Sequence, residues 1–254
     1  MTFSLISIAC LFHDLSPFPL FYQKFLRSPC ITNQPDPSTA MPPSKEEQIT
    51  HLHTLLPATE IFHPGTAQYT AQSTPWSTWA NLHPALVLQP TTLPALATVV
   101  QYLYTSTLDF AVRNTGTGSV SARDVVLSTH GFKSFAFDEA DESVVVGAGF
   151  DWGEVDALME ERAPGWQVVG ARCSWVGVVG SALVGGLSWL SHEFGMISDP
   201  CNLLDAQVVL KDGRVVWASE EGEGDLMWAL RGGGGNFGGL PPDLLQFFIS
   251  SEIV

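Results

Sequence analysis

Apolar and polar positions along this chain follow two patterns, one typical of helices and one typical of short strands. Apolar residues recur at helical spacing in the segments Ser44 to Leu56, Leu93 to Tyr104 and Asp151 to Glu161. Ser44 with Glu47, and Asp151 with Glu154, have the spacing of a capping box. Thr92 stands where the cap of the middle segment is expected. These segments are therefore predicted to be helices.

The second pattern consists of short runs rich in Val, Leu and Phe, which predict strands at 85–88, 109–113, 125–128, 134–137 and 143–146. Two Val-rich arms from Ala206 to Ala218 flank Asp212-Gly213, a pair that readily adopts a tight turn, and predict a hairpin. A short helix capped by Asp225 is expected next, whereas Pro57 to Pro84 is expected to be mostly loop. Mixed helices and strands of this kind indicate an α+β fold.

The chain is expected to divide into three stretches of different character. Residues 28–45 are rich in Pro, Ser and Thr, which is typical of a disordered connector. We therefore expect residues 1–43 to be a disordered leader or a wrongly assigned start, with Met41 as the alternative initiator. Residues 44–80 are expected to form an N-terminal helix and loop, and residues 81–254 the main domain.

Composition narrows the classes of partner. The chain has 254 residues, of which 45% are hydrophobic, and this is enough to bury a substantial core. Its net charge of -15, from 26 acidic and 11 basic residues, argues against binding a nucleic-acid backbone. The net charge does not argue against an anionic dinucleotide as a ligand, because backbone N–H groups hold a pyrophosphate without basic side chains.

Metal, disulfide and membrane signals are weak. The four cysteines are dispersed and form no CxxC pair. His51 and His53 are two apart on a predicted helix, so they do not share a face and make a poor metal pair. No apolar stretch reaches the roughly 20 residues that span a bilayer, and no basic residue precedes the apolar start as in a signal peptide. We expect a cytoplasmic protein with no metal, no membrane and no nucleic acid as partners.

Glycine-rich segments carry the candidate chemistry. Val112 to Ser119 leaves a strand and can present several N–H groups to a pyrophosphate, although an ordinary turn uses the same residues. Val176 to Leu187 spaces glycines so that a flat ligand can approach the backbone, although close packing also selects glycine. Leu230 to Gly238 holds four consecutive glycines, which in isolation are typical of a linker.

A dinucleotide fold of the Rossmann type is the competing enzyme hypothesis. Val144 to Gly149 is followed by a capped helix, as that motif requires. However, Gly153 lies one residue too far along for GxGxxG, and no acidic residue ends a second strand about 20 residues later. The spacing therefore disfavours this hypothesis.

The order of the glycine-rich and neighbouring segments along the chain favours a different family. The loop at Arg113 to Gly118, the turn Gly147 to Trp152, the run Cys173 to Gly186, the element Gly195 to Pro200, the hairpin and the run Asp225 to Gly232 follow one another. In this order the chain resembles the FAD-linked oxidoreductases of the berberine bridge enzyme and vanillyl-alcohol oxidase superfamily, particularly their fungal secondary-metabolism branch. The resemblance covers roughly residues 80–238. It implies a PCMH-type FAD-binding domain made of two small α/β subdomains.

The resemblance also implies which residues contact the cofactor. Pyrophosphate and ribityl contacts fall on the loop residues Arg113, Asn114, Thr115, Gly116, Thr117 and Gly118. The isoalloxazine and diphosphate path falls on Gly177, Val178, Gly180 and Ser181. Remaining flavin contacts fall near Asp199 and Val215.

The resemblance also bears on whether the flavin is covalently attached. Many family members tether the flavin through a histidine at the position of Thr117, which cannot form that bond, so no histidyl link is expected. Cys173 matches the cysteine of a second tether, although a free cysteine is also common as a small buried side chain. We expect FAD to be held noncovalently, with a cysteinyl link through Cys173 as the alternative.

The activity implied by the resemblance is oxidation of a small organic metabolite by hydride transfer to flavin, with dioxygen as the acceptor. After Gly238 the chain departs from its relatives, so we expect it to be truncated and to lack the substrate domain. The catalytic base of the family usually comes from that part, and none is assigned here; His192 fits a structural role better. The alternative is a noncatalytic flavin-binding fragment or the product of a faulty gene model.

Overall fold

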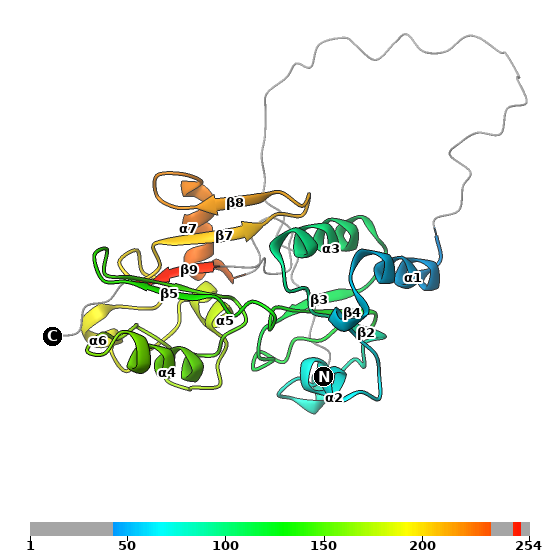
Figure 1. Cartoon of the computed structure of the whole chain (residues 1–254), viewed down its shortest axis with the longest axis horizontal. Coiled ribbons are helices and arrows are strands. Elements are labelled where there is room, and N and C mark those ends of the chain that lie inside the picture. Colours follow the sequence, from blue (N-terminus) through cyan, green and yellow to red (C-terminus); the bar gives the residue numbers. More distant parts are fainter. Residues whose placement is uncertain (1–42, 235–245, 250–254) are drawn as a thin grey trace, which may run out of the picture. The chain divides into compact units, whose positions relative to one another are not determined.

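The computed structural model describes residues 43–234 and, for the backbone alone, residues 246–249 (Figure 1). The expected leader and Met41 lie outside the described residues, apart from Pro43. The described residues form two sheets with helices packed against them, which agrees with the expected pair of α/β subdomains.

The first sheet is mainly parallel. Its strands run in the order β1-β2-β4-β3, in which β2, β4 and β3 are parallel and β1 is antiparallel to β2. Every residue of β2 and β4 is buried, as is usual for strands covered on both faces. The predicted strands are confirmed as β2 Leu86–Leu88, β3 Phe110–Arg113 and β4 Val125–Ser128, with β1 Ile61–Phe62 added at the edge.

Two of the predicted helices accompany this sheet. Helix α1, Lys45–Leu55, begins with the expected capping box of Ser44 and Glu47. Helix α3, Leu93–Thr105, is capped by Thr92 and connects β2 to β3. The two helices pack side by side (Figure 1), where the Tyr102 hydroxyl donates to the Gln48 carbonyl over 3.1 Å.

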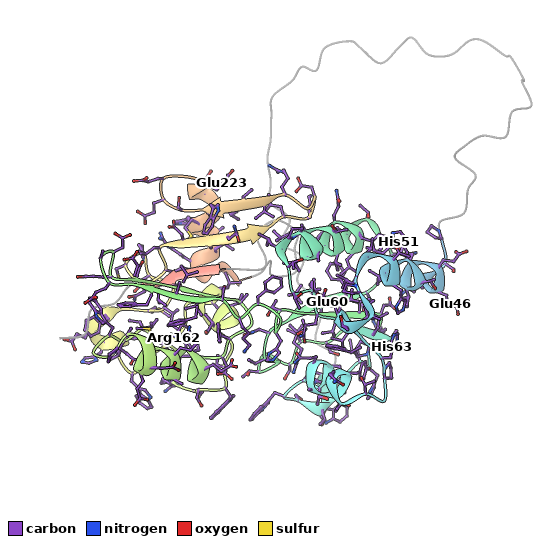
Figure 2. All side chains as sticks on the ribbon, viewed as in Figure 1. Glu46, His51, Glu60, His63, Arg162 and Glu223 are labelled. Carbon is purple, nitrogen blue, oxygen red and sulfur yellow. The ribbon has the colours of Figure 1, made fainter. Side chains whose placement is uncertain are left out.

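The histidines near α1 make a ring contact with each other. His51 and His53 lie on α1; Figure 2 labels His51 and His63. The His53 ring stacks on that of His63 with centroids 5.2 Å apart. Within residues 43–234 there is no group of three His, Cys, Asp or Glu side chains that could hold a metal ion.

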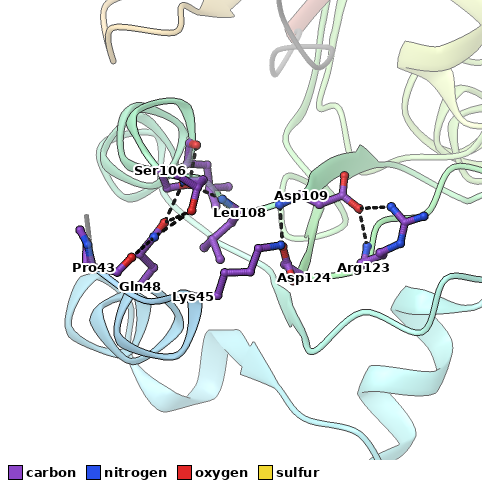
Figure 3. A network of polar contacts seen from close by, with 10 residues as sticks. Pro43, Lys45, Gln48, Ser106, Leu108, Asp109, Arg123 and Asp124 are labelled. Atoms are coloured by element: carbon purple, nitrogen blue, oxygen red, sulfur yellow. Dashed lines mark hydrogen bonds and ion pairs between the residues drawn. The ribbon is translucent and has the colours of Figure 1, made fainter. Parts of the chain in front are cut away.

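A polar network ties α1 to the carboxyl-terminal side of α3 and to β4 (Figure 3). The Lys45 ammonium binds the Asp124 carboxylate, which also accepts a 2.7 Å hydrogen bond from Asp109 N. Gln48 is buried, and its side-chain oxygen accepts from Thr107 N over 2.8 Å. The N-terminal helix is therefore part of the folded unit that carries the first sheet.

The segment from Pro57 to Pro84 is more ordered than its sequence predicted. It contains α2, Ala67–Ser73, together with short 3₁₀ turns η2 Ala58–Glu60 and η3 Thr78–Ala80. The expectation of a loop was wrong because α2 has no apolar stripe, and Ser73 is its one buried residue. Instead, Thr66 caps its N-terminus and the helix packs against β2 and β4.

The second sheet is antiparallel throughout, in the order β5-β6-β9-β7-β8. The predicted strands are confirmed as β5 Phe135–Asp138, β6 Ser143–Val146 and the hairpin of β7 Asp205–Val209 with β8 Val215–Ala218. Gly213 in its turn has a φ of 81°. Strand β9, Gln246–Ile249, lies between β6 and β7, so the segment that departs from the family pattern still contributes to the sheet.

Four helices belong to this second part: α4 Trp152–Arg162, α5 Val178–Leu183, α6 Ser191–Phe194 and α7 Gly224–Gly233. The predicted capping box at Asp151 is confirmed. The predicted cap Asp225 is wrong: Glu223 occupies the cap position without a side-chain bond, and Asp225 lies in the first turn. Its carboxylate there still favours the helix N-terminus.

Helices α4 and α5 are joined by a buried tryptophan. Trp152 is fully buried, and its indole N–H donates to the Ser181 hydroxyl over 2.7 Å. A Cβ on Gly170 would approach this ring to 2.7 Å, so only glycine fits there. Trp152 thereby fixes α5 at the position from which it lines the cavity described below. In the described part of the chain, no helix has the length and apolar character needed to span a bilayer.

Candidate functional site

A cavity of about 520 Å³ lies between the loop that follows β3 and the segment that carries α5. Its lining has one charge sign. Although the chain holds 26 acidic residues, none of the described residues that line this cavity is Asp or Glu. Two arginines, Arg113 and Arg172, are among them. A cavity without carboxylates in so acidic a protein is suited to an anionic ligand.

Arg113 supports the first wall from beneath. It ends β3 and is buried, and its guanidinium donates to Gln72 Oε1 over 3.2 Å and to the carbonyls of Thr74 and Thr115 over 3.0 Å each. Burial lowers the pKa of Arg113, but an arginine remains charged throughout the physiological range. The guanidinium therefore connects the loop, through the Thr115 carbonyl, to the segment that contains Gln72 and Thr74.

The loop backbone also requires glycine. Gly116 has a φ of 82°, and a Cβ at this position would lie 2.5 Å from the Arg113 guanidinium. Ser119 N donates to the Gly116 carbonyl over 2.9 Å and closes the turn. Gly116 is therefore required both for its backbone conformation and for space.

The N–H groups of the loop are available to a ligand. The backbone N–H groups of residues 114–118 donate no hydrogen bond to any residue in the described ranges. Consecutive unpaired N–H groups in a turn form a concave, electropositive surface that binds phosphate oxygens. This is the property that the sequence predicted for the Arg113 to Gly118 loop.

The opposite wall touches this loop through Trp175. The hydroxyls of Thr115 and Thr117 lie 3.0 Å apart, and Thr117 donates to the Trp175 carbonyl over 3.3 Å. On the outer side Trp76 N donates to the Gly116 carbonyl over 3.1 Å, and the Trp76 and Trp175 rings stack with centroids 6.4 Å apart. Cys173 lines the cavity nearby as a partly buried free thiol.

The two walls also meet at Asn114 and Gly177. Asn114 donates from its amide nitrogen to the Ala148 carbonyl over 2.7 Å. Its buried Oδ1 has no hydrogen-bond partner among the described residues, and a Cβ on Gly177 would lie 1.6 Å from that oxygen. Since Gly177 has a φ of -68°, space rather than backbone conformation demands glycine here.

The structure brings together most of the site residues predicted from the sequence. The following line the cavity: Arg113, Asn114, Thr115, Gly116, Thr117, Gly118, Cys173, Gly177, Gly180 and Ser181.

Three predicted residues lie outside that lining. Val178 is fully buried, and its N–H donates to the Phe150 carbonyl over 3.1 Å. Asp199 accepts from Met196 N over 2.7 Å and packs on Gly195, where a Cβ would lie 2.3 Å from its carboxylate. Val215 lies on β8 and is 39% exposed. Cofactor contact by these residues stays a prediction.

Arg172 lines the cavity and was not predicted as a site residue. It follows the buried pair Val168 and Val169, and no motif includes it. Nothing in the local sequence distinguishes it from the other ten basic residues of the chain. Val120, Thr129 and Leu187 also line the cavity and were not predicted.

A comparison with family models identifies the fold around this cavity. Residues 84–219 match the FAD-binding domain family. The chain belongs to this family. The match includes both walls of the cavity, from β2 to β8, and the confirmed resemblance is to FAD-linked oxidoreductases of the berberine bridge enzyme and vanillyl-alcohol oxidase superfamily.

Individual relatives agree with this assignment. An uncharacterised FAD-linked oxidoreductase of Arthroderma benhamiae is 32% identical over 209 residues, covering 79% of this chain and 41% of the relative. The (R)-6-hydroxynicotine oxidase of Paenarthrobacter nicotinovorans is 28% identical, covering 70% of this chain and 39% of the enzyme. The chain therefore spans about two fifths of the length of these curated relatives.

Solved structures show the same fold. The wild-type BBE-like 1 protein of Physcomitrella patens superposes with a TM-score of 0.70 at 26% identity, covering 83% of this chain and 45% of that protein.

The cavity of this FAD-binding domain has the chemistry that FAD requires. The N–H groups of residues 114–118, which donate to no described residue, suit a diphosphate, and a Cβ at Gly118 or Gly180 would meet no atom within 4 Å. The acid-free lining avoids repulsion of the cofactor's negative charge.

Proposed function

We propose that this chain forms the FAD-binding part of an oxidoreductase that oxidises a small organic metabolite by hydride transfer to the flavin and returns the electrons to dioxygen. The observation that carries the proposal is the acid-free cavity with the unpaired N–H groups of residues 114–118 on one wall. A relative whose name is (R)-6-hydroxynicotine oxidase supports the choice of a small organic donor and an oxidase reaction.

The residues of the chain have separate tasks in this proposal. Residues 114–118 would hold the diphosphate through their N–H groups, and Arg113 keeps their loop in position. Gly118 and Gly180, where a Cβ would meet no atom within 4 Å, would leave room for the ring system. When bound, FAD supplies the two-electron redox chemistry. Since Thr117 provides no imidazole, the proposal includes no histidyl link. The cofactor is held noncovalently, with a cysteinyl link through the free thiol of Cys173 as the alternative.

The proposal is tested with the full-length purified chain. We expect a yellow protein, or a colourless protein that gains a flavin spectrum and quenched tryptophan fluorescence on addition of FAD. The matched variant Gly177→Ala, which places a methyl group against Asn114, should lose that binding. A folded wild-type protein that takes up no FAD would refute the proposal.

The same preparation distinguishes the two forms of the hypothesis. Incubation of the FAD-loaded chain with candidate donors, followed by measurement of hydrogen peroxide, tests for oxidase activity. Turnover supports the oxidoreductase. Bound FAD without turnover of any donor supports the alternative of a noncatalytic flavin-binding fragment.

A further inference from the structure

Most basic side chains in the part of the chain that the structure describes form an ion pair with a carboxylate. Nine lysines and arginines lie in the described residues, and six of them form an ion pair with Asp or Glu. The three described cations without such a pair are Arg113, Arg172 and Lys211. Two of these three line the cavity, so the positive charge left uncompensated by the fold is concentrated there.

Arg113 and Arg172 use their charge differently. Arg113 is buried, and its terminal nitrogens donate to Gln72, Thr74 and Thr115. The Arg172 guanidinium is exposed and donates to no acceptor in residues 43–234; its backbone N–H alone is bonded, to the Leu187 carbonyl over 3.2 Å. Arg172 therefore retains all of its side-chain donors for a ligand.

The position of Arg172 is restricted all the same. Its guanidinium carbon lies 5.7 Å from the centroid of the Trp189 ring, within the range of a cation–π contact. Its backbone N–H donates to the Leu187 carbonyl, and its neighbours Ala171 and Cys173 also line the cavity. A guanidinium over an aromatic face keeps its N–H groups in its own plane, where they can form a two-pronged contact with a carboxylate or phosphate.

We propose that Arg172, supported by Trp189, forms an anion-binding subsite at the rim of the cavity. The ligand is an oxyanion, carboxylate or phosphate, carried by the molecule bound there. This inference rests on the proposed function for the identity of that molecule. The donor is the favoured source, because the N–H groups of residues 114–118 already serve the cofactor's diphosphate. The subsite thus assigns the donor to the class of organic acids or phosphate esters.

The first experiment needs no cofactor. The cofactor-free full-length chain is titrated with inorganic phosphate and with benzoate at constant ionic strength, with binding followed by calorimetry. Arg172→Met should weaken binding about tenfold, the loss expected when one charge-assisted contact is removed. Arg172→Lys, which keeps the charge but not the fork, should retain part of the affinity.

Arg162→Met is the matched control. Arg162 lies on α4 (Figure 2), and its guanidinium carbon is also 5.7 Å from an aromatic centroid, that of Phe135. It is paired with Glu161 and does not line the cavity. The substitution should leave anion affinity unchanged. An equal loss of anion affinity in the two variants would overturn the subsite, because it would show a general effect of charge. Unchanged anion affinity in Arg172→Met would overturn it as well.

The second experiment identifies the source of the oxyanion. If the diphosphate of the cofactor is the ligand, Arg172→Met weakens FAD about tenfold but leaves riboflavin, which has no phosphate, unaffected. If the donor is the ligand, FAD affinity is unchanged and the FAD-loaded variant loses benzoate binding instead. If the chain binds phosphate through Arg172 but takes up no FAD, the proposed function is refuted and the subsite is still supported.

Discussion

The Asn114 side-chain oxygen lies 1.6 Å from the point that a Cβ on Gly177 would occupy. These two residues come from opposite walls of the cavity, the loop after β3 and the start of α5. Their contact fixes the separation of the walls, and the Asn114 amide is in turn held by the Ala148 carbonyl. The separation of the cavity walls thus depends on the absence of a methyl group at Gly177.

Gly177→Ala should therefore destabilise the fold and abolish FAD binding. The new methyl group cannot coexist with the Asn114 amide, so the hydrogen bond to Ala148 is broken or α5 shifts. Overpacking of this kind costs about 1–3 kcal/mol, measurable by urea unfolding. In an Asn114→Ala background the same substitution should cost much less. Equal costs in the two backgrounds would contradict the contact.

Gly180→Ala provides the contrasting case. Gly180 lies within α5, and a Cβ there meets no heavy atom within 4 Å. Alanine in place of a helical glycine should stabilise the cofactor-free chain by about 0.5–1 kcal/mol. Because the residue lines the cavity, the methyl group should at the same time weaken FAD binding. Unchanged FAD affinity in a stabilised variant would show that Gly180 does not face the cofactor.

Local signals in the sequence were sufficient for much of the fold. The capping boxes at Ser44 and Asp151 and the Asp212-Gly213 turn act within a few residues of themselves, so they were predictable without tertiary information. Helix α5 was not predicted, because its Val-rich sequence has low helix propensity and it forms where Trp152 bonds Ser181.

The residues of the candidate site likewise fall into those that a local motif predicts and those that depend on tertiary packing. The loop of residues 113–118 and the glycines of α5 stand out as motifs, and both line the cavity. Arg172 could not be identified from sequence, because its significance lies in having no carboxylate partner while six other cations have one. That property depends on long-range packing and is invisible along the chain.

Arg113→Met should destabilise the protein and loosen the loop. The substitution removes the donors to the Thr74 and Thr115 carbonyls and to Gln72. Unsatisfied buried acceptors of this kind cost about 1–3 kcal/mol, which urea unfolding would detect. Arg123→Met, which removes a largely exposed ion pair with Asp109, should change stability little. Similar losses in the two variants would argue against a special role for Arg113.

Glu154 should make stability depend on pH. Burial raises the pKa of its carboxyl, but hydrogen bonds from the Lys133 ammonium and from Asp151 N outweigh burial and leave the pKa below its ordinary 4.5. A lowered folded pKa contributes stability above pH 4.5 that is lost as the pH falls through the folded value.

Glu154→Gln should accordingly be less stable than the wild type at pH 7, and the difference should shrink below pH 4.5. The effect is expected to stay under about 1 kcal/mol, because the side chain is 43% exposed and screened by solvent. Urea unfolding across a pH series measures it. Glu160→Gln on the same helix, whose carboxylate has no ion pair in the described structure, serves as control. A constant difference at every pH would contradict the linkage.

Acid precipitation of the FAD-loaded chain should release all of its flavin into the supernatant. The resemblance implies that Thr117 stands where many family members carry a tethering histidine, and its hydroxyl contacts the Thr115 hydroxyl and the Trp175 carbonyl. Cys173 is the remaining candidate for a covalent link, as a free thiol at the cavity wall. Cys173→Ser should therefore release flavin to the same extent as the wild type. Flavin that stays with the wild-type precipitate but leaves the Cys173→Ser precipitate would instead establish a cysteinyl tether.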